Sequence, residues 1–155
     1  MSTDDLQGVP TDDLLIERRI ELDLDADQLW ALVATADGWQ RWLVDGGEVD
    51  VRPGGAGVVI DGDVEREVRI ATVHQGREMS FTWWERDDPA SASEVSISIV
   101  PRHDGGAGLS IVERIPSARI RACASTSSAV VESVRFAWEV RACILWAGSR
   151  SIVRV

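Results

Sequence analysis

The 155-residue chain contains no lysine, no asparagine, no tyrosine, only two histidines and two cysteines, and no long apolar run. Because a membrane-spanning helix needs about 20 consecutive apolar residues, we predict no membrane span. Cys123 and Cys143 lack zinc-site spacing and are too few for a disulfide framework, so we expect them to be reduced and buried. The acidic start, residues 1–13, lacks the features of a signal peptide, which favours a cytoplasmic location.

The excess of acidic residues argues against nucleic acid as a partner. The formal net charge is −10 at pH 7, and all 16 basic residues are arginine. Residues 114–155 are the exception, with seven arginines and two acidic residues. A surface that binds DNA or RNA needs clustered basic groups, and the acidic remainder of the chain repels a polyanion. We interpret the basic end as a solvated helix face or as a surface that docks a protein partner.

The sequence contains no recognisable catalytic, metal or phosphate motif. His74 and His103 fall in predicted turns, without ligand spacing or a carboxylate and nucleophile at triad spacing. The glycine-rich runs 54–57 and 105–108 connect strand to strand, so no helix N-terminus follows them to receive a phosphate. We therefore predict no catalytic residue, no metal and no cofactor.

Apolar periodicity and capping residues predict a strand followed by two short helices. From Ile16 to Leu24, apolar residues alternate with charged ones, which is typical of a half-buried strand. Asp25 and Gln28 have the spacing of a capping box, so a helix should begin at Ala26. A second short helix is expected after Asp37-Gly38.

The remainder of the chain alternates with a period of two and then ends in a helical pattern. Turn residues recur at hairpin spacing and predict six strands, at 47–52, 56–61, 63–74, 77–86, 93–102 and 107–115. A long helix is expected over Ala129–Ala147, capped by Gly148 and about 30 Å in length, enough to cover one face of an antiparallel sheet. The predicted fold class is α+β, with seven antiparallel strands. A single domain is expected at 14–148, between a disordered acidic tail (1–13) and a C-terminal tail (149–155).

Several short motifs occur in a fixed order along residues 14–147. They are Leu29-Trp30, Trp39 with Trp42, Val51-Arg52-Pro53-Gly54-Gly55, Met79-Ser80-Phe81-Thr82-Trp83, Gly105-Gly106 followed by Leu109 to Glu113, and Trp138 to Trp146. Their order resembles the START-like (SRPBCC) superfamily, and within it the bacterial relatives of the activators of heat-shock protein 90 ATPase. The resemblance implies the helix-grip fold, in which a curved sheet wraps around a long C-terminal helix. It also implies a cavity between sheet and helix, which in many members holds an apolar or amphipathic small molecule.

A tight turn at Gln75-Gly76 would set the register of the two strands beside it. The expected cross-strand pairs are Thr72 with Met79, Ile70 with Phe81, Val68 with Trp83, and Arg66 with Glu85. Their side chains should face inward, and the last pair should form an ion pair. The same alternation turns further residues inward, namely Val95, Ile97, Ile99, Leu109, Ile111 and Glu113. Trp84 has the opposite parity to Trp83 and should face outward.

Arg18 is the single charge on the inward face of the first strand. Because the helix-grip fold makes the first and last strands neighbours, the resemblance implies a second inward ion pair, between Arg18 and Glu113. Inward charges need partners or solvent, since an unpaired buried charge costs several kcal/mol. The two pairs either close the mouth of the sheet or anchor the polar end of a ligand. The candidate ligand-binding residues are Arg18, Trp42, Arg66, Val68, Ile70, Met79, Phe81, Trp83, Glu85, Ile97, Ile111, Glu113 and Trp138.

The expected function is binding of a small hydrophobic or amphipathic molecule without catalysis. One alternative is a cyclase- or hydratase-type enzyme that uses Glu85 or Glu113 beside an arginine. A second alternative is a co-chaperone-like interaction module, in which Trp84 and the arginines of the C-terminal helix dock a protein partner or a second copy. The expected partners are thus a small molecule and, in the last case, a protein.

Overall fold

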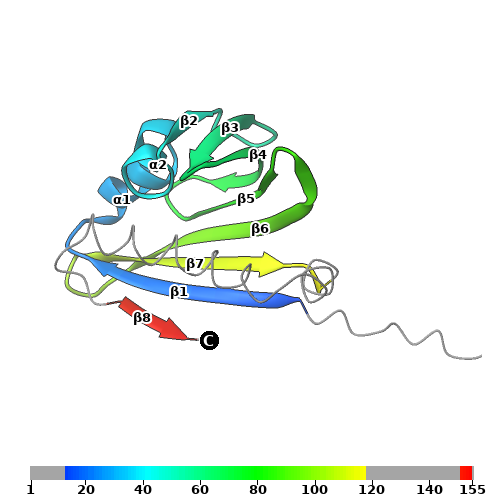
Figure 1. Cartoon of the computed structure of the whole chain (residues 1–155). Coiled ribbons are helices and arrows are strands. Elements are labelled where there is room, and N and C mark those ends of the chain that lie inside the picture. The colour runs from blue at the N-terminus through cyan, green and yellow to red at the C-terminus, as the bar shows by residue number, and fades with distance from the viewer. Residues whose placement is uncertain (1–12, 118–150, 155) are drawn as a thin grey trace, which may run out of the picture.

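The computed structural model describes residues 13–117 and 151–154. Within these two ranges, a first strand is followed by two helices and then by seven more strands (Figure 1). The elements are β1 (Leu14–Leu22), α1 (Ala26–Val33), α2 (Ala36–Trp42), β2 (Gly46–Val49), β3 (Ala56–Asp61), β4 (Val64–His74), β5 (Glu78–Glu85), β6 (Asp88–Pro101), β7 (Ala107–Ile115) and β8 (Ser151–Arg154). This order confirms the α+β class. The predicted helix Ala129–Ala147 lies outside the described residues.

The eight strands of the described residues belong to one antiparallel sheet with the order β2-β3-β4-β5-β6-β7-β1-β8. The sheet is strongly curved, and β6 runs through the bend (Figure 1). The seven predicted strands are all present, and β1 pairs with β7 as the resemblance implied. The expectation of seven strands was one too few, because β8 in the expected C-terminal tail pairs with β1.

Local side-chain hydrogen bonds fix where the two helices begin. In α1, Asp25 Oδ1 accepts from the Gln28 amide at 2.8 Å, and Gln28 Oε1 accepts from the Asp25 amide at 3.1 Å, which confirms the predicted capping box. In α2, Thr35 Oγ1 accepts from the Gly38 amide at 3.0 Å. The second helix therefore begins at Ala36, before Asp37-Gly38 and not after it, since Thr35 supplies the cap.

Helices α1 and α2 approach each other closely at Gly38. A Cβ on this residue would lie 2.3 Å from the carbonyl oxygen of Leu32, in α1. The same oxygen accepts a hydrogen bond from the Trp42 indole Nε1 at 3.0 Å. A glycine is therefore required at this position by the contact between the helices, although glycine is a poor helix former.

We expect Gly38→Ala to destabilise the protein by about 2 kcal/mol, because relief of the clash must separate the two helices and stretch the hydrogen bond from Trp42. The free energy of unfolding from urea titrations measures the effect. Gly46→Ala is the matched control, since a Cβ there meets only the Ile60 side chain, at 3.9 Å, and should change stability by less than about 0.5 kcal/mol. Equal effects of the two substitutions would refute this explanation.

The register of β4 and β5 follows the prediction over only part of its length. Arg66, Val68 and Ile70 lie opposite the expected partners, Glu85, Trp83 and Phe81. The register then shifts by one residue between Ile70 and Thr72. The predicted pair of Thr72 with Met79 is therefore wrong.

The shift arises because the turn between His74 and Glu78 holds three residues instead of two. Gly76 lies within this turn and has a φ of 74°, which glycine adopts without strain. Beyond the shift, Val73 lies opposite Met79 and packs against the core. Thr72 is instead exposed, and its hydroxyl is hydrogen-bonded to that of Ser80 at 2.8 Å.

The inner face of the sheet and the two helices form one apolar core. Trp39, in α2, is 0% exposed, and its ring centroid lies 4.7 Å from that of Phe81 on β5. Phe81 in turn contacts Trp83 edge-on at 5.6 Å. A row of three aromatic rings in contact thus joins α2 to the sheet. No helix within the described ranges has the length and apolarity needed to cross a membrane.

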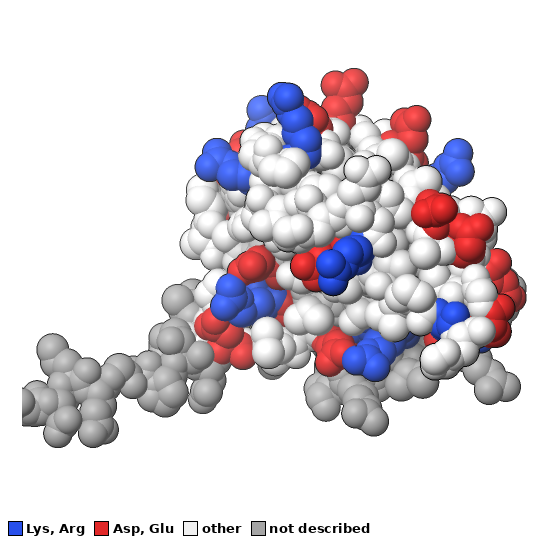
Figure 2. Space-filling model, turned by 180° about the vertical axis from the view of Figure 1, so that it is seen from behind, with Lys and Arg blue, Asp and Glu red and all other residues white. Residues whose placement is uncertain are grey.

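Several surface arginines lie next to carboxylates. On the face shown in Figure 2, arginine and acidic side chains occur in small mixed groups. The ion pairs join Arg19 to Glu17, Arg52 to Asp50, Arg86 to Glu65, Arg102 to Asp104, and Arg114 to Glu94. Because neighbouring carboxylates offset these positive charges, the five arginines make a poor surface for phosphates.

Candidate functional site

The apolar residues predicted for the site lie on the inner face of the sheet. Their side chains come from β4, β5, β6 and β7, and each residue is at most 3% exposed. They are Val68, Ile70, Met79, Phe81, Trp83, Ile97 and Ile111. Strand alternation alone placed them on this face, and the buried fractions agree.

Two tryptophans in the predicted helices, Trp42 and Trp138, were also candidate ligand-binding residues. Trp42 is 9% exposed, and its indole N–H donates to Leu32 in α1. Its polar atom is therefore used to hold the helix pair together, and its ring belongs to the core. Trp138 lies outside the described residues.

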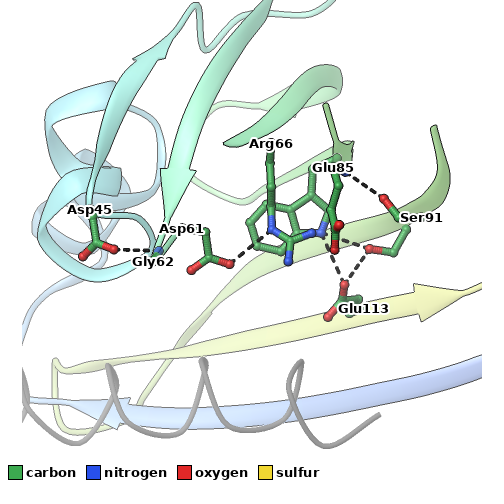
Figure 3. A network of polar contacts seen from close by, with 9 residues as sticks. Asp45, Asp61, Gly62, Arg66, Glu85, Ser91 and Glu113 are labelled. Carbon is green, nitrogen blue, oxygen red and sulfur yellow. Dashed lines mark hydrogen bonds and ion pairs between the residues drawn. The ribbon is translucent and has the colours of Figure 1, made fainter. Parts of the chain in front are cut away.

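A buried carboxylate interrupts the apolar face. Glu113, on β7, is 4% exposed, and its Oε1 accepts from Ser93 Oγ at 2.6 Å and from the Trp83 indole Nε1 at 3.3 Å (Figure 3). The indole Nε1 also lies 2.9 Å from Ser93 Oγ. The three residues come from adjacent strands, because Trp83 pairs with Ser93 on β6, and Val95 on β6 pairs with Glu113. The carboxylate is therefore fixed through one of its two oxygens.

Arg66 binds an acid other than the one predicted. Its Nε lies 3.2 Å from Asp61 Oδ2, and both side chains are 12% exposed. Its guanidinium carbon lies 4.9 Å from the centroid of the Trp83 ring, a cation–π arrangement. Glu85 lies opposite Arg66 in the register, but the expected ion pair between them is replaced by the one with Asp61. Figure 3 shows the guanidinium directed toward Asp61, which ends β3.

The backbone at Glu85 is held by a second buried serine. The Glu85 amide donates to Ser91 Oγ at 2.7 Å, and Ser91 is 4% exposed. The pairing of β5 with β6 is irregular between Trp83 and Glu85, where β6 begins. The serine hydroxyl thus binds an amide at the point where the ladder is interrupted.

Arg18 and Glu113 share the inner face without lying directly opposite each other. The register pairs Arg18 with Ile111 and Glu113 with Ile16, so the two charged residues are diagonal neighbours. Arg18 is 8% exposed. The resemblance implied Arg18 as the partner of Glu113. The hydrogen bonds to the Glu113 carboxylate come instead from Ser93 and Trp83.

Three polar residues that contact Arg66, Glu85 and Glu113 were not predicted from the sequence. They are Asp61, Ser91 and Ser93. Ser91 and Ser93 have the same parity as the inward residues Val95 and Ile97, so the period of two, extended toward Asp88, would have found them. Within the described ranges, no group of three histidine, cysteine, aspartate or glutamate side chains is arranged to hold a metal ion. The site is therefore an apolar face with polar groups at one end.

A separate open groove of about 880 Å³ lies between α2, β2 and β3. None of the residues predicted for the site lines it. Its lining residues are Ala36, Asp37, Gln40, Gly47, Glu48, Val49, Asp50, Ala56, Gly57 and Val58.

A match to a family model shows which family the chain belongs to. The model of the family described as "Activator of Hsp90 ATPase homolog 1-like protein" matches residues 23–139. The chain belongs to this family. Members of the family have the START-like (SRPBCC) fold, which agrees with the curved antiparallel sheet and the two helices after β1. No curated protein sequence matches the chain.

Solved structures share the fold at low sequence identity. An Hsp90 activator from Plasmodium falciparum has a TM-score of 0.65 and 16% identity, over 90% of this chain and 99% of that one. CalU16 from Micromonospora echinospora has a TM-score of 0.62 and 19% identity, over 88% and 82% of the two chains. The Aha1 dimer from Colwellia psychrerythraea has a TM-score of 0.56 and 10% identity, over 64% and 74%. These likenesses establish the fold of this family member.

Proposed function

We propose that this protein binds a small hydrophobic or amphipathic molecule against the inner face of its sheet, without catalysis. The observation that carries the proposal is a buried carboxylate, Glu113, next to the buried apolar residues of this face. Small-molecule sites typically combine apolar walls with a few fixed polar groups of this kind. The predicted helix Ala129–Ala147, with Trp138, would close the site from the other side, and a cytoplasmic location remains part of the proposal.

The affinity of an apolar probe can be estimated from the surface that it would bury. A ligand that loses roughly 300 Å² of apolar surface gains roughly 7 kcal/mol at about 25 cal/mol/Å². Association costs several kcal/mol of this gain. We therefore expect dissociation constants in the micromolar range for simple apolar probes.

Titration with N-phenyl-1-naphthylamine, a neutral probe that fluoresces in apolar surroundings, tests the proposal. We expect saturable binding with one probe per chain. Ile111→Trp, which adds volume to the inner face, should weaken the binding at least tenfold. Val112→Trp is the matched control, because the neighbouring side chain points to the other face and is only half-buried.

Urea titration of both variants checks that they remain folded, and Ile111→Phe replaces the larger substitution if the tryptophan prevents folding. Absence of saturable binding in the unmodified protein would refute the proposal. Equal loss of probe binding in Ile111→Trp and Val112→Trp would show that the probe does not bind on the inner face.

Activation of a chaperone ATPase is the second candidate function, and membership in this family favours it. One similar solved structure is described as an Hsp90 activator and another as an Aha1 dimer. The ATPase rate of a purified Hsp90-type chaperone, measured with and without an equimolar amount of this protein, tests the candidate. A clear increase would support it, and an unchanged rate would exclude it for that chaperone. Sedimentation of the purified protein would show whether it forms a homodimer.

A further inference from the structure

The Glu113 carboxylate uses only one of its oxygens within the described part of the chain. Both of its hydrogen bonds, from Ser93 and Trp83, end on Oε1. Oε2 receives no donor from these residues, although the residue is only 4% exposed. A buried polar atom without a hydrogen bond costs free energy, so such an atom needs a donor from a ligand or from water.

From this geometry we infer that the head group of the ligand is a hydrogen-bond donor, an alcohol or an amine, that binds Glu113 Oε2. The inference rests on the proposed function and specifies the class of molecule bound. Oε1 is already held by two donors from β5 and β6, so the position of Oε2 is fixed before the ligand arrives. Preorganised acceptors of this kind select between ligands more strongly than apolar walls do.

The charges on the inner face also disfavour an anionic head group. Asp61 and Arg66 form an ion pair and offset each other. Among the described residues, the other charged groups on this face are Arg18, Glu85 and Glu113, which leaves one net negative charge. A carboxylate head group would meet Oε2 as a second acceptor and would be repelled, whereas an alcohol or amine would donate to it.

Three probes with the same ten-carbon chain test the inference: decan-1-ol, decylamine and decanoate. Displacement of N-phenyl-1-naphthylamine gives the affinity of each probe. We expect the alcohol or the amine to bind at least tenfold more tightly than decanoate, and the order of these two identifies the head group. Decanoate binding as tightly as both donors would overturn the inference while leaving the proposed function intact. Failure of every probe to bind would instead refute the proposed function.

Glu113→Gln provides the decisive variant. The Trp83 indole N–H can only donate, so the amide oxygen of the glutamine should replace Oε1 and its NH₂ group should replace Oε2. The preference for donors should then fall to within about threefold, or reverse toward decanoate. Glu94→Gln is the matched control, because Glu94 is paired with Arg114 on the other face of the sheet, and the preference should persist there. An unchanged preference in Glu113→Gln would also overturn the inference.

Discussion

Replacing Trp39 with alanine should lower the free energy of unfolding by about 3–5 kcal/mol, because it empties the centre of the core. The side chain is 0% exposed, and its ring centroid lies 4.7 Å from that of Phe81. Its indole Nε1 also donates to the Val33 carbonyl at 2.6 Å, so the substitution leaves a buried acceptor without its donor. Urea titrations followed by far-ultraviolet circular dichroism measure the loss.

Trp84→Ala serves as the control for this prediction. Trp84 lies opposite Glu67 on the outer face, as its parity predicted, and is half-buried. Its removal should cost less than about 1.5 kcal/mol. A cost for Trp84 equal to that for Trp39 would mean that the two faces of the sheet contribute alike, contrary to the burial pattern.

The second large effect is expected from Asp61→Ala, which should cost about 3 kcal/mol. The substitution leaves the Arg66 guanidinium over the Trp83 ring without its carboxylate, in a place where both side chains are only 12% exposed. Arg66→Met removes the guanidinium charge, so no unpaired charge is left when the two substitutions are combined. The double variant should therefore be more stable than the sum of the two single losses predicts, by at least about 1 kcal/mol.

The exposed pair of Arg86 with Glu65 provides the comparison. Both side chains are 54% exposed, and Glu65→Ala should cost less than about 1 kcal/mol. Strict additivity of Asp61→Ala and Arg66→Met would show that the buried pair is not energetically coupled.

The sequence predicted the strands well because alternation marks each half-buried strand directly. Arg66, Val68 and Ile70 have the predicted partners, since register follows from the inward apolar set. The shift at Thr72 was not predictable in this way. Thr72 and Val73 are both β-branched residues that fit a strand, and a single extra turn residue decides which of them faces inward.

The polar part of the site was harder to predict for two reasons. Ser91 and Ser93 are inward residues that a search for apolar alternation passes over, although their parity fits. Arginine side chains are long enough to reach diagonal neighbours, so register alone could not decide between Asp61 and Glu85 as the partner of Arg66. The pairing of β8 with β1 was missed because four residues carry too little periodicity to indicate a strand.

Methyl-group NMR during titration with decan-1-ol tests the central claim most directly, because it locates the bound molecule. We expect saturable shifts at inner-face methyl groups, such as those of Val68, Ile97 and Ile111. The methyl groups of Val100, on the outer face, and of Val58, in the separate groove, should not move. Shifts confined to Val100 or Val58, or no saturable shift at any methyl group, would contradict binding on the inner face.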